Sequence, residues 1–421
     1  METKFKLLIA VLLFSLSMAC NQKESEQNRV TKRKAVTAKD ILGNPDYLAI
    51  SYGGYRAKTR DVQPTIKQLK EDMHILAAMG IKVLRTYNVQ LPQAPNLLKA
   101  IRELKQENPD FEMYVMLGAW IDCKNAWTDQ APDHNVESEQ NEGEIARAVA
   151  LANQYPEIVK ILAVGNEAMV KWAESYYVQP DVILKWVKHL QNLKKEGKLP
   201  TELWITSSDD FSSWGGGDST LQVPALAELV KEVDYISMHT YPYHNSHYNP
   251  EFWKVPESEA QLSDLEQVDL AMLRAKAFAV NQYDSVAAYV KSLGVTKPIH
   301  IGETGWATIS NGHYGPKGSK ASDEYKQGLY YKHMREWSNQ AGVSCFYFEA
   351  FDEQWKDAGN PKGSENHFGL INLKGEAKFP IWDLVDQGVF RGLTRDGQEI
   401  VKSYNGDKNA LLKEVLAPPA H

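Results

Sequence analysis

Cysteine is scarce in this chain, with only three among its 421 residues. Cys20, Cys123 and Cys345 lie far apart, and no two of them form a Cys-x-x-Cys pair. This pattern excludes both a disulfide framework and a Cys-x-x-Cys metal site. We expect Cys123 and Cys345, which fall beside predicted strand ends, to be buried free thiols.

Positive charge is also in short supply. The chain has 47 Lys and Arg against 54 Asp and Glu, a net charge of -7. This balance argues against electrostatic binding to nucleic acid or anionic lipid, whereas a neutral polymer would not be repelled. The hydrophobic content of 43% and the charged content of 24% are those of an ordinary globular protein.

The first apolar run, residues 7–16, is too short to span a bilayer but suits a signal peptide. Lys4 and Lys6 precede it, and Ala19 stands directly before Cys20. This arrangement resembles a bacterial lipoprotein processing site, in which the cysteine becomes the lipidated N-terminus. The alternative is plain secretion after cleavage near Ala19.

We therefore predict a signal peptide over residues 1–19, lipidation of Cys20 and a location in the cell envelope. Residues 20–44 are polar without apolar periodicity, which predicts a flexible tether. The remaining regions would be the main folded domain over residues 45–390 and a short C-terminal extension over 391–421. We expect a monomer.

From residue 47 onward, short apolar strands alternate with amphipathic helices. Eight strands are predicted, all almost continuously apolar, as strands buried on both faces should be. They are Tyr47–Gly53, Lys82–Tyr87, Glu112–Trp120, Val159–Glu167, Leu203–Ser208, Tyr235–Tyr241, Pro298–Glu303 and Ser344–Ala350.

Helices are predicted between these strands, over Pro64–Gly80, Asn96–Glu107, Glu142–Gln154, Pro180–Gly197, Val223–Glu232, Tyr283–Leu293 and Ala321–Gln340. Eight strand–helix units favour a single (β/α)8 TIM barrel. A doubly wound open sheet is the alternative, but no Gly-rich phosphate loop follows the first strand. Long polar insertions over 121–141 and 242–271 follow strands, so they should lie on the active-site face.

Two predicted strands end in carboxylates. One finishes as Val164-Gly-Asn-Glu167, and the other leads into Gly302-Glu303-Thr-Gly-Trp306. These would be the fourth and seventh strands, which lie across a barrel from each other. Two facing glutamates are what hydrolysis of a glycosidic bond requires.

Both motifs resemble the signatures of glycoside hydrolase family 17, whose members are β-1,3-glucanases and related glucanosyltransferases. A third block, Phe348-Glu-Ala-Phe-Asp-Glu353-Gln-Trp-Lys356, resembles the family's eighth-strand motif. The resemblance spans residues 47 to 385, and the joint occurrence of the motifs is more specific than any one alone. The third position after Glu303 is Trp306, but Ala307 and Thr308 replace the usual Pro-Ser.

The resemblance implies Glu167 as general acid/base and Glu303 as nucleophile. Retaining hydrolysis needs one protonated and one ionised carboxyl about 5 Å apart, so their environments must push the two pKa values apart. Asn166 would contact the sugar 2-OH, or cap a helix instead. Tyr241 would donate to the nucleophile, or be an ordinary core tyrosine.

Further substrate contacts are predicted at the strand ends. Arg85 and Tyr87 would order Glu303 or bind sugar hydroxyls, although a buried arginine can simply bridge strands. Trp306, Trp355 and Trp120 would form a stacking platform for sugar rings. Glu353 and Lys356 would bind hydroxyls, and packing is the alternative for each aromatic residue.

No cofactor is expected. His239, His244 and His247 raise the question of a metal, but their spacing matches no zinc signature and the carboxylate mechanism needs none. The expected activity is retaining hydrolysis of a β-1,3-glucan such as laminarin. The alternatives are glucanosyl transfer at the same site, a catalytically inactive glucan-binding protein, and a related barrel glycosidase acting on another polymer.

Overall fold

The computed structural model describes residues 35–421, of which Thr37–His421 form one compact unit. The predicted signal peptide, Cys20 and most of the predicted tether lie outside the described residues. The folded unit begins with helix α2, Ala38–Ile41, whose ends are buried, so the domain starts ahead of the predicted boundary at residue 45.

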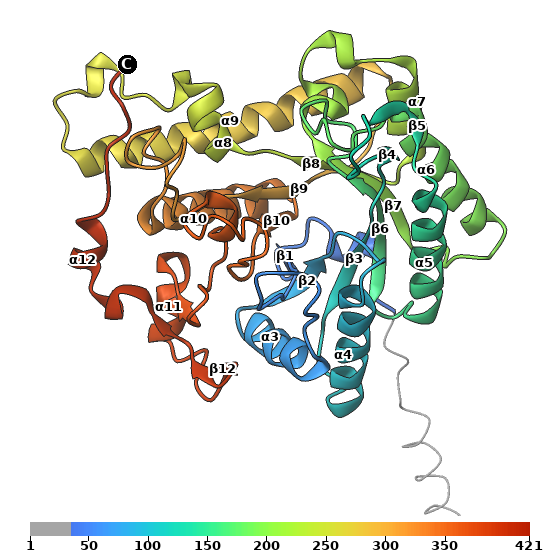
Figure 1. Ribbon diagram of the computed structural model, residues 1–421, viewed down its shortest axis with the longest axis horizontal. Coiled ribbons are helices and arrows are strands. Elements are labelled where there is room, and N and C mark those ends of the chain that lie inside the picture. The colour runs from blue at the N-terminus through green and yellow to red at the C-terminus, as the bar shows by residue number, and fades with distance from the viewer. Residues whose placement is uncertain (1–34) are drawn as a thin grey trace, which may run out of the picture. The chain divides into compact units, whose positions relative to one another are not determined.

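A closed barrel of eight parallel strands forms the centre of this unit (Figure 1). Neighbouring strands follow chain order, and β1 pairs with β10 to close the ring, which excludes the open sheet. All eight predicted strands and the (β/α)8 fold are confirmed. The strands are β1 (Leu48–Ser51), β2 (Ile81–Arg85), β3 (Tyr114–Ala119), β6 (Val159–Asn166), β7 (Trp204–Asp210), β8 (Ile236–His239), β9 (Ile299–Gly305) and β10 (Cys345–Phe348).

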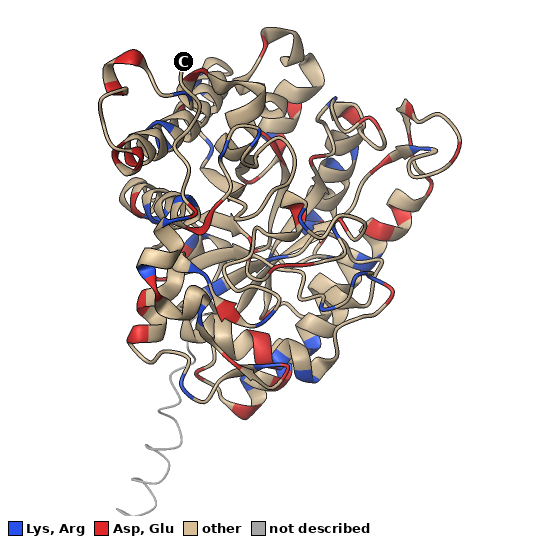
Figure 2. Ribbon diagram, turned by 60° about the vertical axis from the view of Figure 1, so that its left-hand side comes forward, with Lys and Arg blue, Asp and Glu red and all other residues tan. Residues whose placement is uncertain are grey.

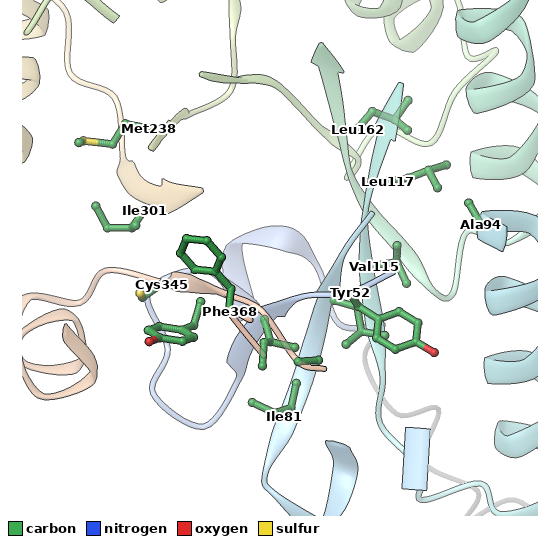
Figure 3. Packing of buried hydrophobic residues seen from close by; sticks show 14 of the residues in the cluster. Tyr52, Ile81, Ala94, Val115, Leu117, Leu162, Met238, Ile301, Cys345 and Phe368 are labelled. Carbon is green, nitrogen blue, oxygen red and sulfur yellow. The ribbon is translucent and has the colours of Figure 1, made fainter. Parts of the chain in front are cut away.

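Apolar side chains on these strands, together with those of the surrounding helices, make up the core (Figure 3). Leu117 of β3 faces Leu162 of β6 in register, and Ile301 of β9 pairs with both Met238 and Cys345 on its two sides. Every residue of β3 and β9 is buried, as expected for strands covered on both faces. Cys345, like Cys123, is a buried free cysteine, which confirms the prediction for both.

Helices cover the outside of the barrel, and acidic and basic residues are interspersed along them (Figure 2). Local capping signals explain several of their starts: Thr65 and Gln68 form a capping box, and Pro180 begins a helix at a position where its missing N–H costs nothing. The helices are α3 (Ile66–Ala78), α4 (Gln93–Glu107), α5 (Gln140–Gln154), α6 (Pro180–Lys195), α7 (Pro224–Glu232), α9 (Asp264–Ser292) and α10 (Glu324–Ala341). Within residues 35–421, no helix is long and apolar enough to cross a membrane.

The two long insertions carry more regular structure than predicted. Residues 121–141 contain a small antiparallel hairpin, β4 (Cys123–Lys124) and β5 (Asp133–Glu137). Residues 242–271 contain α8 (Pro242–Tyr248) and the start of α9. The predicted helix Tyr283–Leu293 is therefore only the C-terminal part of α9, which begins at a capping box formed by Ser263 and Glu266.

The C-terminal extension packs on the barrel. Its hairpin, β12 (Thr394–Arg395) and β13 (Gln398–Glu399), places the buried Arg395 against helix α3, where its Nε donates to Asp72 Oδ1 at 3.0 Å. Asp72 Oδ2 also accepts from the hydroxyl of Tyr52 at 2.9 Å. Because Tyr52 follows β1 and lines the cleft described below, the extension supports one wall of that cleft.

Candidate active site

Glu303 lies on β9, where basic and hydroxyl donors surround its carboxylate. Arg85 Nη1 is 2.5 Å from its Oε2, and the hydroxyls of Tyr87 and Tyr241 donate to Oε2 and Oε1, each at 2.6 Å. Burial opposes ionisation, but Arg85 and the two tyrosines outweigh it and lower the pKa of Glu303 to about 2. Glu303 is therefore ionised at neutral pH, as a nucleophile must be. The predicted contacts of Arg85, Tyr87 and Tyr241 are all present.

Glu167 directly follows β6 and has an unusual backbone conformation. Its φ of +47° lies in the left-handed region, and Gly165 before it has a φ of +80°. A side chain at Gly165 would also come within 2.8 Å of the Ala168 side chain, so glycine is required there. This bend turns the Glu167 carboxyl to His239, whose Nδ1 lies 3.0 Å from Oε1. Such local strain is typical of functional sites.

The pKa of Glu167 is raised well above its usual value. Burial is the main cause, and the negative charge of Glu303 is the next. The site therefore separates two chemically identical groups into an acid that keeps its proton and a carboxylate that has lost it. One carboxylate oxygen of each glutamate and a ring nitrogen of His239 all lie within 4.8 Å of one another. That spacing matches the short separation of retaining glycosidases rather than the wider gap of inverting ones.

Asn166, the last residue of β6, directly precedes Glu167. Its Oδ1 accepts from Arg85 Nη2 at 2.5 Å, which fixes the amide and directs its nitrogen to the cleft as a donor. This orientation fits the predicted contact with a sugar hydroxyl. Arg85, only 1% exposed, thus bonds to both Asn166 and Glu303 and sets their relative position.

A cleft of about 690 Å³ lies beside this group, and its lining includes Asn166 and Glu303 but not Glu167. Of the residues predicted to contact substrate, it is lined by Tyr87, Trp120, Asn166, Glu353, Trp355 and Lys356, together with Glu303 itself. Arg85 and Tyr241 act from beneath, through Glu303.

Glu353 and Lys356 also hold the cleft wall together. Glu353 accepts from the backbone N–H of Tyr55 at 2.9 Å and from Trp355 Nε1 at 2.8 Å. Lys356 Nζ lies 2.5 Å from Glu349 Oε1. Because both oxygens of Glu353 already have protein partners, its first role is to orient Trp355 and the chain after β1.

The predicted sugar platform at Trp306 is wrong. Trp306 is fully buried, packs against Tyr243, Trp253 and Tyr330, and donates from Nε1 to the carbonyl of Ala321 at 2.7 Å. The chain continues as a strand to Gly305, so the next side chain points into the packing between barrel and outer helices and away from the cleft.

The sequence analysis missed four aromatic residues of the cleft lining: Tyr52, Tyr55, Trp127 and Phe348. Tyr55 packs edge-on against Trp355 at 5.8 Å between ring centroids. Trp127, which is 63% exposed, stacks on Tyr176 at 5.1 Å, and Tyr176 also contacts Trp120. Trp127 lies in the insertion predicted to face the active site, and that placement was the available signal.

The histidines do not form the cluster considered from the sequence. His244 lies 3.0 Å from the hydroxyl of Tyr314, and His247 stacks on His313. The one described group with metal-ligand spacing is the two glutamates with His239. There Glu303 already accepts from three protein donors, one of them a guanidinium, whose positive charge disfavours a cation.

Comparisons with known proteins agree with this geometry. Residues 49–369 match the BtgE/BtgC glycoside hydrolase domain. The crystal structure of an endo-laminarinase from Formosa Hel1_33_131 is 66% identical, with a TM-score of 0.91, over 92% of this chain and 98% of that one. A glycoside hydrolase family 17 β-1,3-glucanosyltransferase from Rhizomucor miehei shares the fold, with 19% identity and a TM-score of 0.55 over 80% of this chain and 96% of that one.

A probable glucan endo-1,3-beta-glucosidase (btgC) from Aspergillus clavatus is 25% identical over 333 residues. That match covers 75% of this chain but only 40% of the fungal protein, so the chain spans less than half the length of this curated relative. The resemblance to glycoside hydrolase family 17 is confirmed. From the matched domain and the paired glutamates at its strand ends, the chain belongs to the BtgE/BtgC glycoside hydrolase family.

Proposed function

We propose that this protein is an endo-acting, retaining hydrolase of β-1,3-glucans such as laminarin. The observation that carries the proposal is the close pair of glutamates with opposite pKa shifts, Glu167 upward and Glu303 downward. The β-1,3 linkage and the endo mode are supported by the 66% identical endo-laminarinase, whose chain is matched almost throughout.

The reaction follows from the protonation states. Glu303 attacks the anomeric carbon while Glu167 gives its proton to the departing glycosidic oxygen, which leaves a covalent glycosyl-enzyme. Glu167, now a carboxylate, then takes a proton from water, and the resulting hydroxide equivalent attacks the same carbon and releases Glu303. Asn166 would hold the sugar 2-OH, a bond that strengthens as positive charge develops on the ring.

Product analysis tests this proposal. Chromatography of digests of linear and branched β-1,3-glucans should show a ladder of oligosaccharides from the start, as internal cleavage produces. Release of glucose alone would contradict the endo mode. Glu303→Gln should lower turnover at least about a thousandfold, and near-normal turnover of that variant would contradict the mechanism.

Transfer to a second sugar is the alternative activity of the same site. The aromatic group of Trp120, Trp127 and Tyr176 favours it, because a sugar stacked there could serve as acceptor. Products longer than an oligosaccharide substrate would reveal transfer. A pure binding function is opposed by the two intact glutamates, and it would require binding without any release of reducing ends.

We also propose that the protein is anchored to the cell envelope by a lipid on Cys20 and acts as a monomer. The support for the anchor is the sequence of residues 1–20 alone. Mass spectrometry of the protein from a bacterial membrane fraction should find a lipid-modified Cys20, and Cys20→Ser should release it. A soluble product that begins at Cys20 without lipid would show secretion instead.

A further inference from the structure

His239, at the end of β8, connects the proposed acid to a pair of serines. Its Nδ1 lies 3.0 Å from Glu167 Oε1, and its Nε2 lies 2.8 Å from the hydroxyl of Ser208 on β7. Ser208 in turn lies 2.9 Å from the hydroxyl of Ser237, on the same strand as His239. His239, Ser208 and Ser237 are all fully buried.

The imidazole of His239 is neutral. Burial and, to a smaller extent, the positive charge of Arg85 lower the pKa of His239 to about 4, despite the nearby negative charges of Glu303, Asp209 and Asp210. A neutral imidazole has one donor nitrogen and one acceptor nitrogen. The contacts with Glu167 and Ser208 must therefore run in one of two directions.

Only one direction leaves the acidic proton of Glu167 available for substrate. If Nδ1 accepted, the proton of Glu167 would sit on Oε1 and point to the ring. If Nδ1 carries the hydrogen and donates, Oε1 is the acceptor and the proton belongs on Oε2. The donating arrangement also suits the ionised Glu167 of the second step, because a carboxylate oxygen accepts equally well.

The serine pair can hold this direction. Ser208 would donate to Nε2 of His239 and accept from Ser237, so each hydroxyl has a partner. The backbone leaves room for both at Gly302, the residue before the nucleophile. A side chain there would come within 2.1 Å of Ser237 Oγ and 2.6 Å of Ser208 Oγ.

We propose that His239 is a positioning residue for the general acid, holding the Glu167 carboxyl in place and keeping its acidic proton on Oε2. This role rests on the proposed glycosidase function and deepens it. His239 is fully buried and does not line the cleft, so it acts through Glu167. It gives the buried histidine, first considered as a metal ligand, a part in proton delivery.

The role predicts a dependence on the leaving group. A sugar alcohol is a poor leaving group and needs a proton from Glu167, whereas 2,4-dinitrophenolate departs without one. Loss of His239 should therefore slow cleavage of laminarioligosaccharides much more than cleavage of 2,4-dinitrophenyl β-laminaribioside. A merely structural defect would slow both alike.

The experiment measures kcat/KM for both substrates with wild type, His239→Leu and His239→Asn, after circular dichroism has verified folding. We expect His239→Leu to lose about 100-fold on the oligosaccharide, within the usual range for general acid catalysis, and only a few-fold on the aryl glycoside. His239→Asn, whose amide nitrogen can replace Nδ1 as a donor, should recover about tenfold on the oligosaccharide. The alkaline limb of the pH profile of kcat/KM should move to higher pH in His239→Leu. The Glu167 carboxylate has lost a hydrogen-bond donor there, and this loss raises its pKa.

Equal losses on the two substrates, or no loss on either, would overturn the role of His239. An inactive wild type would instead overturn the proposed function itself. If His239→Leu fails to fold, Ser208→Ala tests the same row of hydrogen bonds. This variant should show a smaller loss of kcat/KM, and the loss should again be greater on the oligosaccharide than on the aryl glycoside. An unchanged ratio between the substrates in Ser208→Ala would contradict the proposal.

Discussion

Glu167 and Glu303 carry the same carboxyl group but have opposite protonation states because their neighbours differ. Glu303 faces Arg85 and two tyrosine hydroxyls, whereas Glu167 faces a neutral imidazole and the charge of Glu303. Each therefore enforces the state of the other. The consequences can be measured one residue at a time.

Removing one hydrogen-bond donor from Glu303, the proposed nucleophile, should make its carboxyl harder to ionise. In Tyr241→Phe, Glu303 loses the hydrogen bond at 2.6 Å that favours its charged form. A hydrogen bond to a charged group contributes about 1.5–3 kcal/mol, so the acid limb of the pH profile of kcat/KM should move up by about one pH unit or more. Tyr243→Phe is the matched control, because that hydroxyl bonds to Ser322 and not to Glu303. An acid limb that stays in place in Tyr241→Phe would contradict the assigned role.

The raised pKa of Glu167 also predicts an effect on stability. Below the unfolded-state pKa of glutamate, near 4.3, the carboxyl is protonated in both states and its raised folded-state pKa does not affect the free energy of unfolding. As the pH rises from there to the folded-state pKa, the free energy of unfolding falls, because the unfolded chain loses this proton more readily than the folded one. Glu167→Gln removes this loss of stability, so at pH 7 its Tm should exceed that of wild type by about 2 °C or more. The gap should close as the pH approaches 4. A lower Tm at neutral pH would show that the native carboxyl is not held against its charge.

Sequence reasoning found the residues whose role follows from a motif and a strand end. Glu167, Glu303, Arg85 and Tyr241 all lie where they were predicted, because a barrel strand of known direction fixes the side chains at its tip. The prediction for Trp306 was wrong because β9 runs two residues beyond the predicted end at Glu303, and the Trp306 side chain is buried in the core. The contacts of His239 with Glu167 and with Ser208 were not predicted, because no motif marks them.

At the scale of elements, the apolar strands were predictable and the loops between them were not. Continuous burial leaves a clear apolar pattern in β3 and β9, whereas β4 and β5 are short and partly exposed. The polar composition of residues 242–271 concealed the first turns of α9. The hairpin of β4 and β5 nevertheless brings Trp127 to the cleft.

This hairpin should contribute to binding of longer chains. Trp127→Ala removes an exposed ring that lines the cleft, and an aromatic stacking contact contributes about 0.5–1.5 kcal/mol. We expect KM for β-1,3-glucan to rise by about 3–10-fold with little change in kcat. Trp172→Ala is the control, since that ring is equally exposed but is not part of the cleft lining. Equal effects of the two variants would argue against a sugar contact at Trp127.

At the scale of the whole molecule, closure of the barrel determines which residues meet at the candidate site. It brings Glu167 of the β6 tip and Glu303 of β9 within reach of the same sugar, although 136 positions of sequence separate them (303 minus 167). The repeated strand–helix pattern predicted this closure. It did not predict the course of the cleft or the docking of Arg395 on α3, which depend on side-chain packing between distant segments.

The stereochemistry of the first product tests the central claim most directly. Proton NMR during hydrolysis of a β-1,3-glucan distinguishes the two anomers at the new reducing end before they interconvert. Double displacement by Glu303 and water predicts that the β-anomer forms first and that the α-anomer grows in later by mutarotation. Initial formation of the α-anomer would mean a single displacement and would contradict the account.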